Sequence, residues 1–327
     1  MSIRLNDGSE IPGLAYGTGS KLKFRDITHY IQLAIEKGFA HIDTASCSYA
    51  FLYLQHVPSL LAVYQTEKYV GKAIKESGLA RSDLYITTKY FPGHPVRQRI
   101  KESLDDLGLE YVDLYLIHQP QLSNVPALWK EFEEVQKEGL ARQADLPDVM
   151  LETSHSSFSR SIGVSNLIDP QQLENLIKVS NVTPAVNQIQ LHPYNHHKMK
   201  HILDACASHG IVIEAYSSLS PITVYPGGPV DIPVRAAAER LGATPTQVVF
   251  LWIKAKGAVV VTTSTNEGHM EEYLAFEDLP PLTAEEVASI DAAGAGGPPG
   301  FASTWGTIVT GVVLLAYGLV KMLLSVD

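Results

Sequence analysis

Short apolar runs typical of buried strands alternate with amphipathic stretches typical of helices from about residue 14 to residue 275. This alternation predicts a parallel sheet, because two parallel strands need a long crossover that is usually a helix. The eight expected strands are residues 14–17, 41–42, 84–88, 112–117, 161–164, 185–190, 212–215 and 259–262. The helices expected between them are residues 27–37, 67–76, 96–107, 126–137, 170–179, 198–209 and 233–240. Eight strand–helix units favour a closed (β/α)8 barrel over an open sheet.

Other stretches lie outside this alternation. An antiparallel hairpin is expected before the first strand, because the turn residues Asn6-Asp7-Gly8 separate two short β-type runs. Residues 47–62 carry no charge and directly follow a strand, and residues 143–160 separate a helix from the next strand by more than the usual handful. Both stretches are interpreted as in-frame insertions in a single barrel spanning residues 1–295. They are either retained introns of a splice variant or a lineage-specific lid whose apolar first part touches a membrane.

The composition adds a candidate membrane segment. Charged residues make up 18% of the 327 residues, below the usual share of about 25%, and residues 301–320 contain none. A linker at 296–304 leads into an expected transmembrane segment at 305–324, since about 20 apolar residues span a bilayer. The alternative is an amphipathic or buried helix. The N-terminus has no apolar signal-peptide core, so we expect a single-pass C-terminal anchor with the barrel facing the cytosol.

Charge and cysteine content narrow the function classes. The net charge of −10 argues against a nucleic-acid partner, which needs a basic surface. Cys47 and Cys206 form no CxxC pair, so neither a disulfide framework nor a zinc site is expected. His197 and His201 stand four residues apart without a third ligand nearby, which favours surface histidines over a metal site. The sequence also lacks the three-glycine dinucleotide fingerprint, a P-loop and the elbow of serine hydrolases.

Polar residues stand at the carboxyl ends of three consecutive expected strands. Asp43, Lys89 and His118 follow the second, third and fourth strands, and (β/α)8 barrels build their active sites at this face. A carboxylate, an ammonium and an imidazole at one mouth can lower the pKa of a phenol, because a nearby cation favours the phenolate. The candidate phenols are Tyr64 and Tyr49. The sequence therefore predicts acid–base chemistry at the barrel mouth.

Six short motifs occur in the order found in the aldo-keto reductases, which this chain resembles from residue 3 to about residue 295. They are His41-Ile42-Asp43-Thr44-Ala45, Ile86-Thr87-Thr88-Lys89, Asp113-Leu114-Tyr115-Leu116-Ile117-His118, Gly163-Val164-Ser165-Asn166, Pro184-Ala185-Val186-Asn187-Gln188-Ile189-Gln190-Leu191-His192-Pro193 and Glu214-Ala215-Tyr216-Ser217. The resemblance implies a (β/α)8 oxidoreductase that moves a hydride from a nicotinamide cofactor to a carbonyl carbon. Hydride attack builds negative charge on the carbonyl oxygen, which hydrogen-bond donors stabilise.

The resemblance also implies roles for individual residues. Tyr64 would be the general acid, and Lys89, paired with Asp43, would lower its pKa. His118 would orient the carbonyl oxygen or relay the proton. The family spacing from the aspartate to the tyrosine is restored when residues 47–62 are removed, which favours Tyr64 over Tyr49.

Cofactor binding is assigned through the same resemblance. The implied cofactor-binding residues are Gly17, Thr18, Ser165, Asn166, Gln188, Tyr216, Ser217, Leu219, Ser264, Asn266 and His269. Ser165, Asn166 and Gln188 would hold the nicotinamide carboxamide, and Tyr216 would stack on the ring. Ser217 and Leu219 would follow the pyrophosphate.

One departure from the family concerns the 2′-phosphate of NADP. Thr263, Ser264 and His269 stand where many members have a Lys-Ser pair and an arginine. A neutral imidazole does not replace a bidentate arginine, so a weakened NADP specificity is expected. Because Thr262-Thr263-Ser264 resembles a fungal ketone-reductase branch, NADP(H) is still expected before NAD(H).

These observations together predict a membrane-anchored barrel that reduces aldehydes or ketones with NAD(P)H. The expected partners are a small-molecule carbonyl substrate and a membrane, with the chain a monomer or weak oligomer. The alternative function is a catalytically impaired barrel that binds cofactor and serves a regulatory role, since residues 47–62 interrupt the Asp43–Tyr64 spacing.

Overall fold

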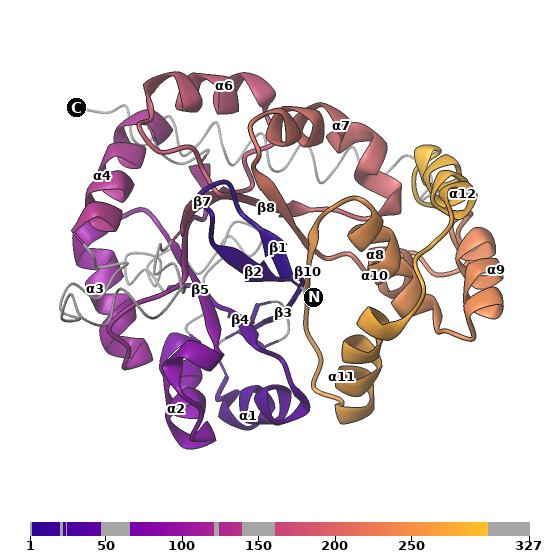
Figure 1. Ribbon diagram of the computed structural model, residues 1–327, viewed down its shortest axis with the longest axis horizontal. Helices are drawn as coiled ribbons and strands as arrows, with labels where there is room; N and C mark the ends of the chain where they lie inside the picture. The colour runs from indigo at the N-terminus through magenta and orange to yellow at the C-terminus, as the bar shows by residue number, and fades with distance from the viewer. Residues whose placement is uncertain are drawn as a thin grey trace, which may run out of the picture.

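Eight parallel strands close into a barrel in the computed structural model, which describes residues 2–19, 22–23, 25–46, 66–120, 124–138 and 161–299 (Figure 1). The strands follow one another around the barrel in chain order, and the last pairs with the first. They are β3 (Leu14–Gly17), β4 (His41–Asp43), β5 (Tyr85–Tyr90), β6 (Leu114–Ile117), β7 (Ser161–Ser165), β8 (Val186–Gln190), β9 (Val212–Tyr216) and β10 (Val259–Thr262). All eight strands predicted from the sequence are confirmed.

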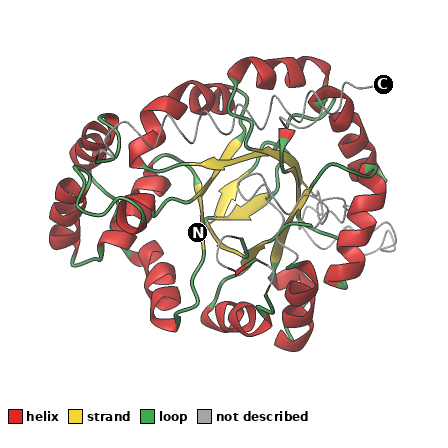
Figure 2. Cartoon of the chain, turned by 180° about the vertical axis from the view of Figure 1, so that it is seen from behind, coloured by secondary structure: helices red, strands yellow, loops and turns green. Residues whose placement is uncertain are grey.

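The strands form where they do because both of their faces are covered. Every residue of β3, β4, β6, β7 and β10 is buried. Strands that are buried on both faces have near-continuous apolar runs instead of an apolar–polar alternation, as the sequence shows. Figure 2, seen from the opposite side, shows the ring of strands inside a ring of helices.

A hairpin of β1 (Ser2–Arg4) and β2 (Glu10–Pro12) covers the amino-terminal end of the barrel (Figure 1). Ile11 of the hairpin packs with Leu114 and Val259 inside the strand ring. The Asn6 side chain also donates to the Pro184 backbone oxygen at 2.9 Å, just ahead of β8. The predicted hairpin is therefore confirmed, and it leaves the carboxyl end of the barrel as the open mouth.

The helices surround the strands, and the predicted ones are all present. They are α1 (Thr28–Lys37), α2 (Glu67–Ser77), α3 (Val96–Leu107), α4 (Val125–Lys137), α6 (Pro170–Val179), α7 (Pro193–Ser208), α8 (Ser220–Thr223), α9 (Asp231–Leu241), α10 (Pro245–Ala255), α11 (Glu267–Leu274) and α12 (Ala284–Ala295). Short 3-10 turns add η3 (Arg81–Asp83) and η5 (Ala275–Asp278).

Two differences from the sequence-based helices have physical reasons. Helix α7 begins at Pro193, five residues before the predicted start, because proline fits the first helical position and the Asn195 side chain accepts from the His192 N–H at 2.9 Å. Helix α10 was not predicted. Its residues from Val248 to Ile253 are all buried, so it lacks the polar face by which a surface helix is recognised.

Several predicted segments lie outside the described residues. These are Tyr49, Tyr64, Cys47, both proposed insertions, and the segment 305–324 together with all but residues 296–299 of its linker. Among the described residues, no helix has the length and apolarity needed to cross a bilayer.

Candidate active site

A buried ion pair stands at the mouth of the barrel. Asp43 ends β4, and Lys89 lies in the neighbouring β5. The Lys89 ammonium donates to Asp43 Oδ1 at 2.6 Å, to Asp43 Oδ2 at 2.8 Å and to the Thr44 carbonyl oxygen at 2.9 Å. Lys89 is 0% and Asp43 is 2% exposed. A buried charge is tolerated when it is paired and its donors are satisfied, and the structure brings this predicted pair together with both conditions met.

His118 follows β6 and lies at the same mouth. It is buried, and burial, followed by the charges of Lys89 and Lys23, holds the pKa of the imidazole well below its usual value. A neutral imidazole has one N–H donor and one acceptor nitrogen. His118 can therefore donate a hydrogen bond to an oxygen in the mouth without carrying a charge.

Three threonine hydroxyls hold the chain beside this pair. Thr18 Oγ1 lies 3.0 Å from Thr44 Oγ1 and 2.8 Å from Thr66 Oγ1, and the Thr44 and Thr66 hydroxyls are 2.9 Å apart. All three residues are fully buried. Thr18 was expected to contact the cofactor, but the structure places its hydroxyl in this cluster. Thr66 is the first described residue after Tyr64, so the chain resumes next to Asp43.

Ser165, Asn166, Gln188 and Tyr216, four of the predicted cofactor-binding residues, form a second polar group at the mouth. The Ser165 hydroxyl donates to the Gln188 carbonyl oxygen at 2.9 Å, and the Tyr216 hydroxyl donates to Asn166 Oδ1 at 2.8 Å. Asn166 Nδ2 donates to the His118 carbonyl oxygen at 3.0 Å and to Ser165 Oγ at 3.1 Å. Asn166 has a left-handed backbone with φ of 60°, a conformation that asparagine tolerates better than most residues.

Two cavities occupy the mouth and share Lys23, Gln188 and Tyr216 in their walls. The first, of about 660 Å³, is also lined by His118, Ser165 and Asn166. The second has a volume of about 580 Å³ and is lined by Gly17, Asp43, Ser217, Leu219 and Thr263, among others. Volumes of about 300–1,000 Å³ are usual for small-molecule sites. The shared walls make the two cavities suitable for one extended ligand with a reacting end beside Asp43 and His118.

The remaining predicted cofactor residues gather at the start of α11. Ser264, Asn266 and His269 are not among the residues that line the two cavities. The Asn266 side chain caps the helix by accepting from the His269 N–H at 3.0 Å, and Ser264 Oγ accepts from the Asn266 N–H at 3.0 Å. This group is adjacent in sequence to Thr263 in the cavity wall. These residues therefore follow the wall of the second cavity directly in the chain.

Sequence reasoning missed two charged residues. Lys23 lines both cavities, and its pKa is lowered by partial burial and then by the nearby Lys89 charge. Glu214 of β9 is fully buried beneath the mouth, where its Oε2 accepts from Gln188 Nε2 at 2.7 Å. Glu214 could have been found from the sequence, because it is an acidic residue inside an otherwise apolar strand. Burying a carboxylate costs free energy unless the group is paired or neutral.

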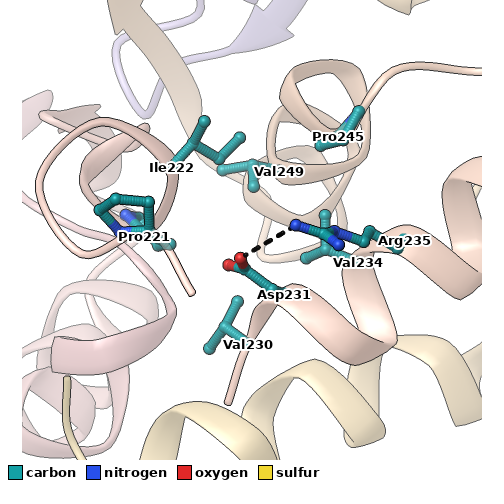
Figure 3. A pocket seen from close by; sticks show the side chains of 9 residues that line it. Pro221, Ile222, Val230, Asp231, Val234, Arg235, Pro245 and Val249 are labelled. Carbon is teal, nitrogen blue, oxygen red and sulfur yellow. Dashed lines mark ion pairs between the residues drawn. The ribbon is translucent and has the colours of Figure 1, made fainter. Parts of the chain in front are cut away.

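Two other features carry no evident chemistry. A cavity of about 150 Å³ lies apart from the mouth between α8, α9 and α10, and its lining is apolar apart from Asp231 and Arg235, which form an ion pair at 3.6 Å (Figure 3). His197 and His201 are exposed on α7. Within the described ranges, no three His, Cys, Asp or Glu side chains converge as a metal site would require.

The sequence profile of the aldo/keto reductase family matches residues 13–149 and 159–222. The chain belongs to the aldo-keto reductase family. This aldo-keto reductase is 32% identical over 285 residues to the NAD/NADP-dependent indole-3-acetaldehyde reductase of Schizosaccharomyces pombe, covering 83% of this chain and 88% of the relative. It is 34% identical over 286 residues to the methylglyoxal reductase DkgA of Salmonella typhimurium, covering 85% and 88%. Both of these relatives are reductases named for an aldehyde or ketoaldehyde.

Solved structures agree with this assignment. An aldo/keto reductase from Brucella melitensis matches with a TM-score of 0.69 and 29% identity over 90% of this chain and 99% of that chain. The aldo-keto reductase of Bombyx mori in complex with NADP matches with a TM-score of 0.69 and 30% identity over 89% and 92%.

The mouth of this aldo-keto reductase fits a nicotinamide cofactor. Gln188 Nε2 donates both of its hydrogens, one to the carboxyl group of Asp43 at 2.8 Å and one to that of Glu214 at 2.7 Å. Its Oε1 therefore remains as an acceptor in the cavity walls, suited to the N–H of a carboxamide. Tyr216 lines both cavities and offers an aromatic ring to a planar group.

Proposed function

We propose that this protein reduces aldehydes or ketones to alcohols with NADPH, and with NADH less well. The observation that carries the proposal is the buried Lys89–Asp43 pair beside a neutral His118, in cavities whose walls include Gln188 and Tyr216. The bound cofactor supplies the hydride. The chain's own residues hold the carbonyl oxygen and provide the proton that balances the new charge.

Tyr64 is proposed as the general acid. It stands two positions before Thr66, and consecutive Cα atoms are about 3.8 Å apart, so its Cα lies within about 8 Å of the Thr66 Cα. The Thr66 hydroxyl is 2.9 Å from that of Thr44, the residue after Asp43. A phenol in this neighbourhood has the Lys89 ammonium to stabilise its phenolate as the proton leaves, and His118 donates to the substrate oxygen.

The proposed acid is tested by comparing Tyr64→Phe with Tyr49→Phe. General acid catalysis contributes about 10²- to 10⁴-fold, so Tyr64→Phe should lose about that factor in kcat and keep NADPH binding within about twofold. Tyr49→Phe, the matched control, should retain its turnover. Methylglyoxal and indole-3-acetaldehyde are suitable probes, because the related enzymes are named for them. Unchanged turnover in Tyr64→Phe would refute the assignment.

The preference for NADPH is supported by the NADP complex of the Bombyx mori relative and by the hydroxyl and amide groups near Thr263. It is tested by the ratio of kcat/KM for NADPH and NADH. His269→Arg should raise this ratio, because a guanidinium binds a phosphate in a bidentate manner. A wild-type ratio below one would contradict the preference.

The second candidate function is cofactor binding without useful turnover. It is motivated by residues 47–62, which separate Asp43 from Tyr64 in sequence. The ends of the surrounding segment are held near one another, since Ser46 Oγ donates to the Lys89 carbonyl oxygen at 2.8 Å and Thr66 is joined to Thr44. Deletion of residues 47–62 is therefore compatible with the barrel. Cofactor binding without turnover in the full chain, and turnover in the deletion variant, would favour this second function.

We also propose that residues 305–324 anchor the barrel to a membrane with the barrel in the cytosol. The support is the length and apolarity of this segment. The full chain should remain in the membrane pellet after alkaline carbonate extraction, and a chain ending at residue 299 should appear in the supernatant. Release of both chains would contradict the anchor.

A further inference from the structure

Four neighbouring polar side chains meet beneath the mouth. Asp43, Lys89, Gln188 and Glu214 come from β4, β5, β8 and β9, and each is at most 2% exposed. Gln188 Nε2 donates to Asp43 Oδ2 at 2.8 Å and to Glu214 Oε2 at 2.7 Å. Glu214 is thus the second of two carboxyl groups that share one amide nitrogen, and the reductive mechanism above does not use it.

An amide nitrogen has two hydrogens, and each of these carboxyl groups takes one. A flipped Gln188 amide would place Oε1 about 3 Å from the Asp43 oxygen, which is also an acceptor, and would remove the Gln188 hydrogen bond from both carboxyl groups. Within the described residues, Oε1 accepts no hydrogen bond in the orientation observed, and Gln188 lines both cavities. The two carboxyl groups therefore determine which end of the amide a ligand meets.

Asn166 has less acceptor capacity to offer than Gln188. Its Oδ1 already accepts from the Tyr216 hydroxyl at 2.8 Å, and its Nδ2 donates to the His118 carbonyl oxygen and to Ser165 Oγ. The Ser165 hydroxyl donates to the Gln188 carbonyl oxygen. Among these side chains as described, Gln188 Oε1 is the acceptor with both lone pairs open to an incoming N–H.

We propose that Glu214 is a positioning residue that, together with Asp43, fixes the Gln188 amide so that Oε1 accepts from the N–H of the nicotinamide carboxamide. This inference rests on the proposed use of a nicotinamide cofactor and adds a residue that selects for its carboxamide group. Burial, followed by the nearby Asp43 charge, raises the pKa of Glu214 to about 8, so the carboxyl group is protonated at neutral pH. Because Glu214 Oε2 accepts from Gln188 Nε2, the proton belongs on Oε1 and Oε2 remains an acceptor. A protonated carboxyl and a primary amide have nearly the same shape, so Glu214→Gln should preserve the arrangement.

The charged and titratable groups that face Glu214 are few among the described residues. Asp43 raises its pKa and Lys89 lowers it. His41 Nε2 lies 3.8 Å from Glu214 Oε1, and burial lowers the pKa of His41 to about 3. Tyr85 of β5 is a buried neutral phenol whose pKa is raised well above its usual value. His41 and Tyr85 thus remain uncharged near neutral pH, and Asp43 and Lys89 balance one another.

The test is a comparison of two reduced cofactors by isothermal titration calorimetry near neutral pH. NADPH has the carboxamide N–H, and the reduced 3-acetylpyridine analogue has a methyl group in its place. One hydrogen bond of this kind corresponds to about a tenfold difference in Kd. Wild type and Glu214→Gln should both prefer NADPH by about tenfold. Glu214→Leu should prefer it by about threefold or less, and Gln188→Leu should show no preference.

Glu214→Leu leaves one Gln188 N–H unpaired, at a cost of about 1–3 kcal/mol. This is less than the stability of a typical domain, about 5–15 kcal/mol, so the variant should fold, and its thermal unfolding midpoint checks this. A full tenfold preference in folded Glu214→Leu overturns the role of Glu214 and leaves the proposed function standing. A wild-type preference near one also overturns the inference, since Gln188 Oε1 would then not contact the carboxamide. Wild type that binds neither cofactor refutes the proposed function itself.

Discussion

Replacing Lys89 by methionine should separate the stability of the buried ion pair from its catalytic use. Methionine fills a similar volume but removes the ammonium that donates to both Asp43 oxygens, at 2.6 and 2.8 Å. Asp43 is 2% exposed and would keep one donor, Gln188 Nε2 at 2.8 Å. Leaving one member of a buried pair unpaired costs about 3–5 kcal/mol. Because one donor remains, we expect about 3 kcal/mol for Lys89→Met.

The double variant Asp43→Asn/Lys89→Met supplies the comparison. It has no unpaired charge, and the amide oxygen introduced by Asp43→Asn could still accept from Gln188, so we expect the double variant to be about 2 kcal/mol more stable than Lys89→Met alone. Stability is measured as the free energy of unfolding in urea, and activity as NADPH oxidation. Turnover should be lost in both variants, since neither has the cation that favours the phenolate. Equal or lower stability of the double variant would refute this reasoning, as would recovered turnover.

Three further predictions concern other parts of the barrel. Burial raises the pKa of Glu214 from 4.5 to about 8, so the stability that the protonated group contributes below pH 4.5 is lost as the pH rises towards 8. Over this range the unfolding free energy of Glu214→Gln should rise relative to that of wild type by up to about 1.4 kcal/mol per pH unit. A difference between the two proteins that does not change with pH would contradict the raised pKa. Gly163→Ala would bring a Cβ to 2.6 Å from the Val186 carbonyl oxygen and should destabilise the barrel by about 1–3 kcal/mol in thermal unfolding, whereas the control Gly296→Ala has nothing within 4 Å and should be neutral or slightly stabilising. Because the pKa of His118 is held well below its usual value, its ring proton signals should not titrate in NMR spectra between about pH 6 and pH 8. A titration midpoint near pH 6.5 would contradict this prediction, because it would show that the imidazole is protonated as in an unburied histidine.

The sequence by itself determined the strand order and the position of the mouth. A strand that is buried on both faces leaves a short apolar run, and eight such runs separated by helices can close in only a few ways. Asp43, Lys89 and His118 could be predicted at one end, because the carboxyl ends of parallel strands share one edge. Helix α10 could not, since burial on all sides removed its amphipathic period.

Only the tertiary structure decided which of these groups touch, and in what state of charge. Gln188 and Asp43 are 145 residues apart in sequence, yet their side chains hydrogen-bond. Glu214 is an ordinary carboxylate when read along β9, but burial and the proximity of Asp43 raise its pKa to about 8. The hydroxyls of Thr18, Thr44 and Thr66 likewise meet only in the folded barrel. Local sequence patterns specify where a strand runs. The desolvation and pairing energies of its side chains depend instead on which groups of the other strands lie within a few ångströms.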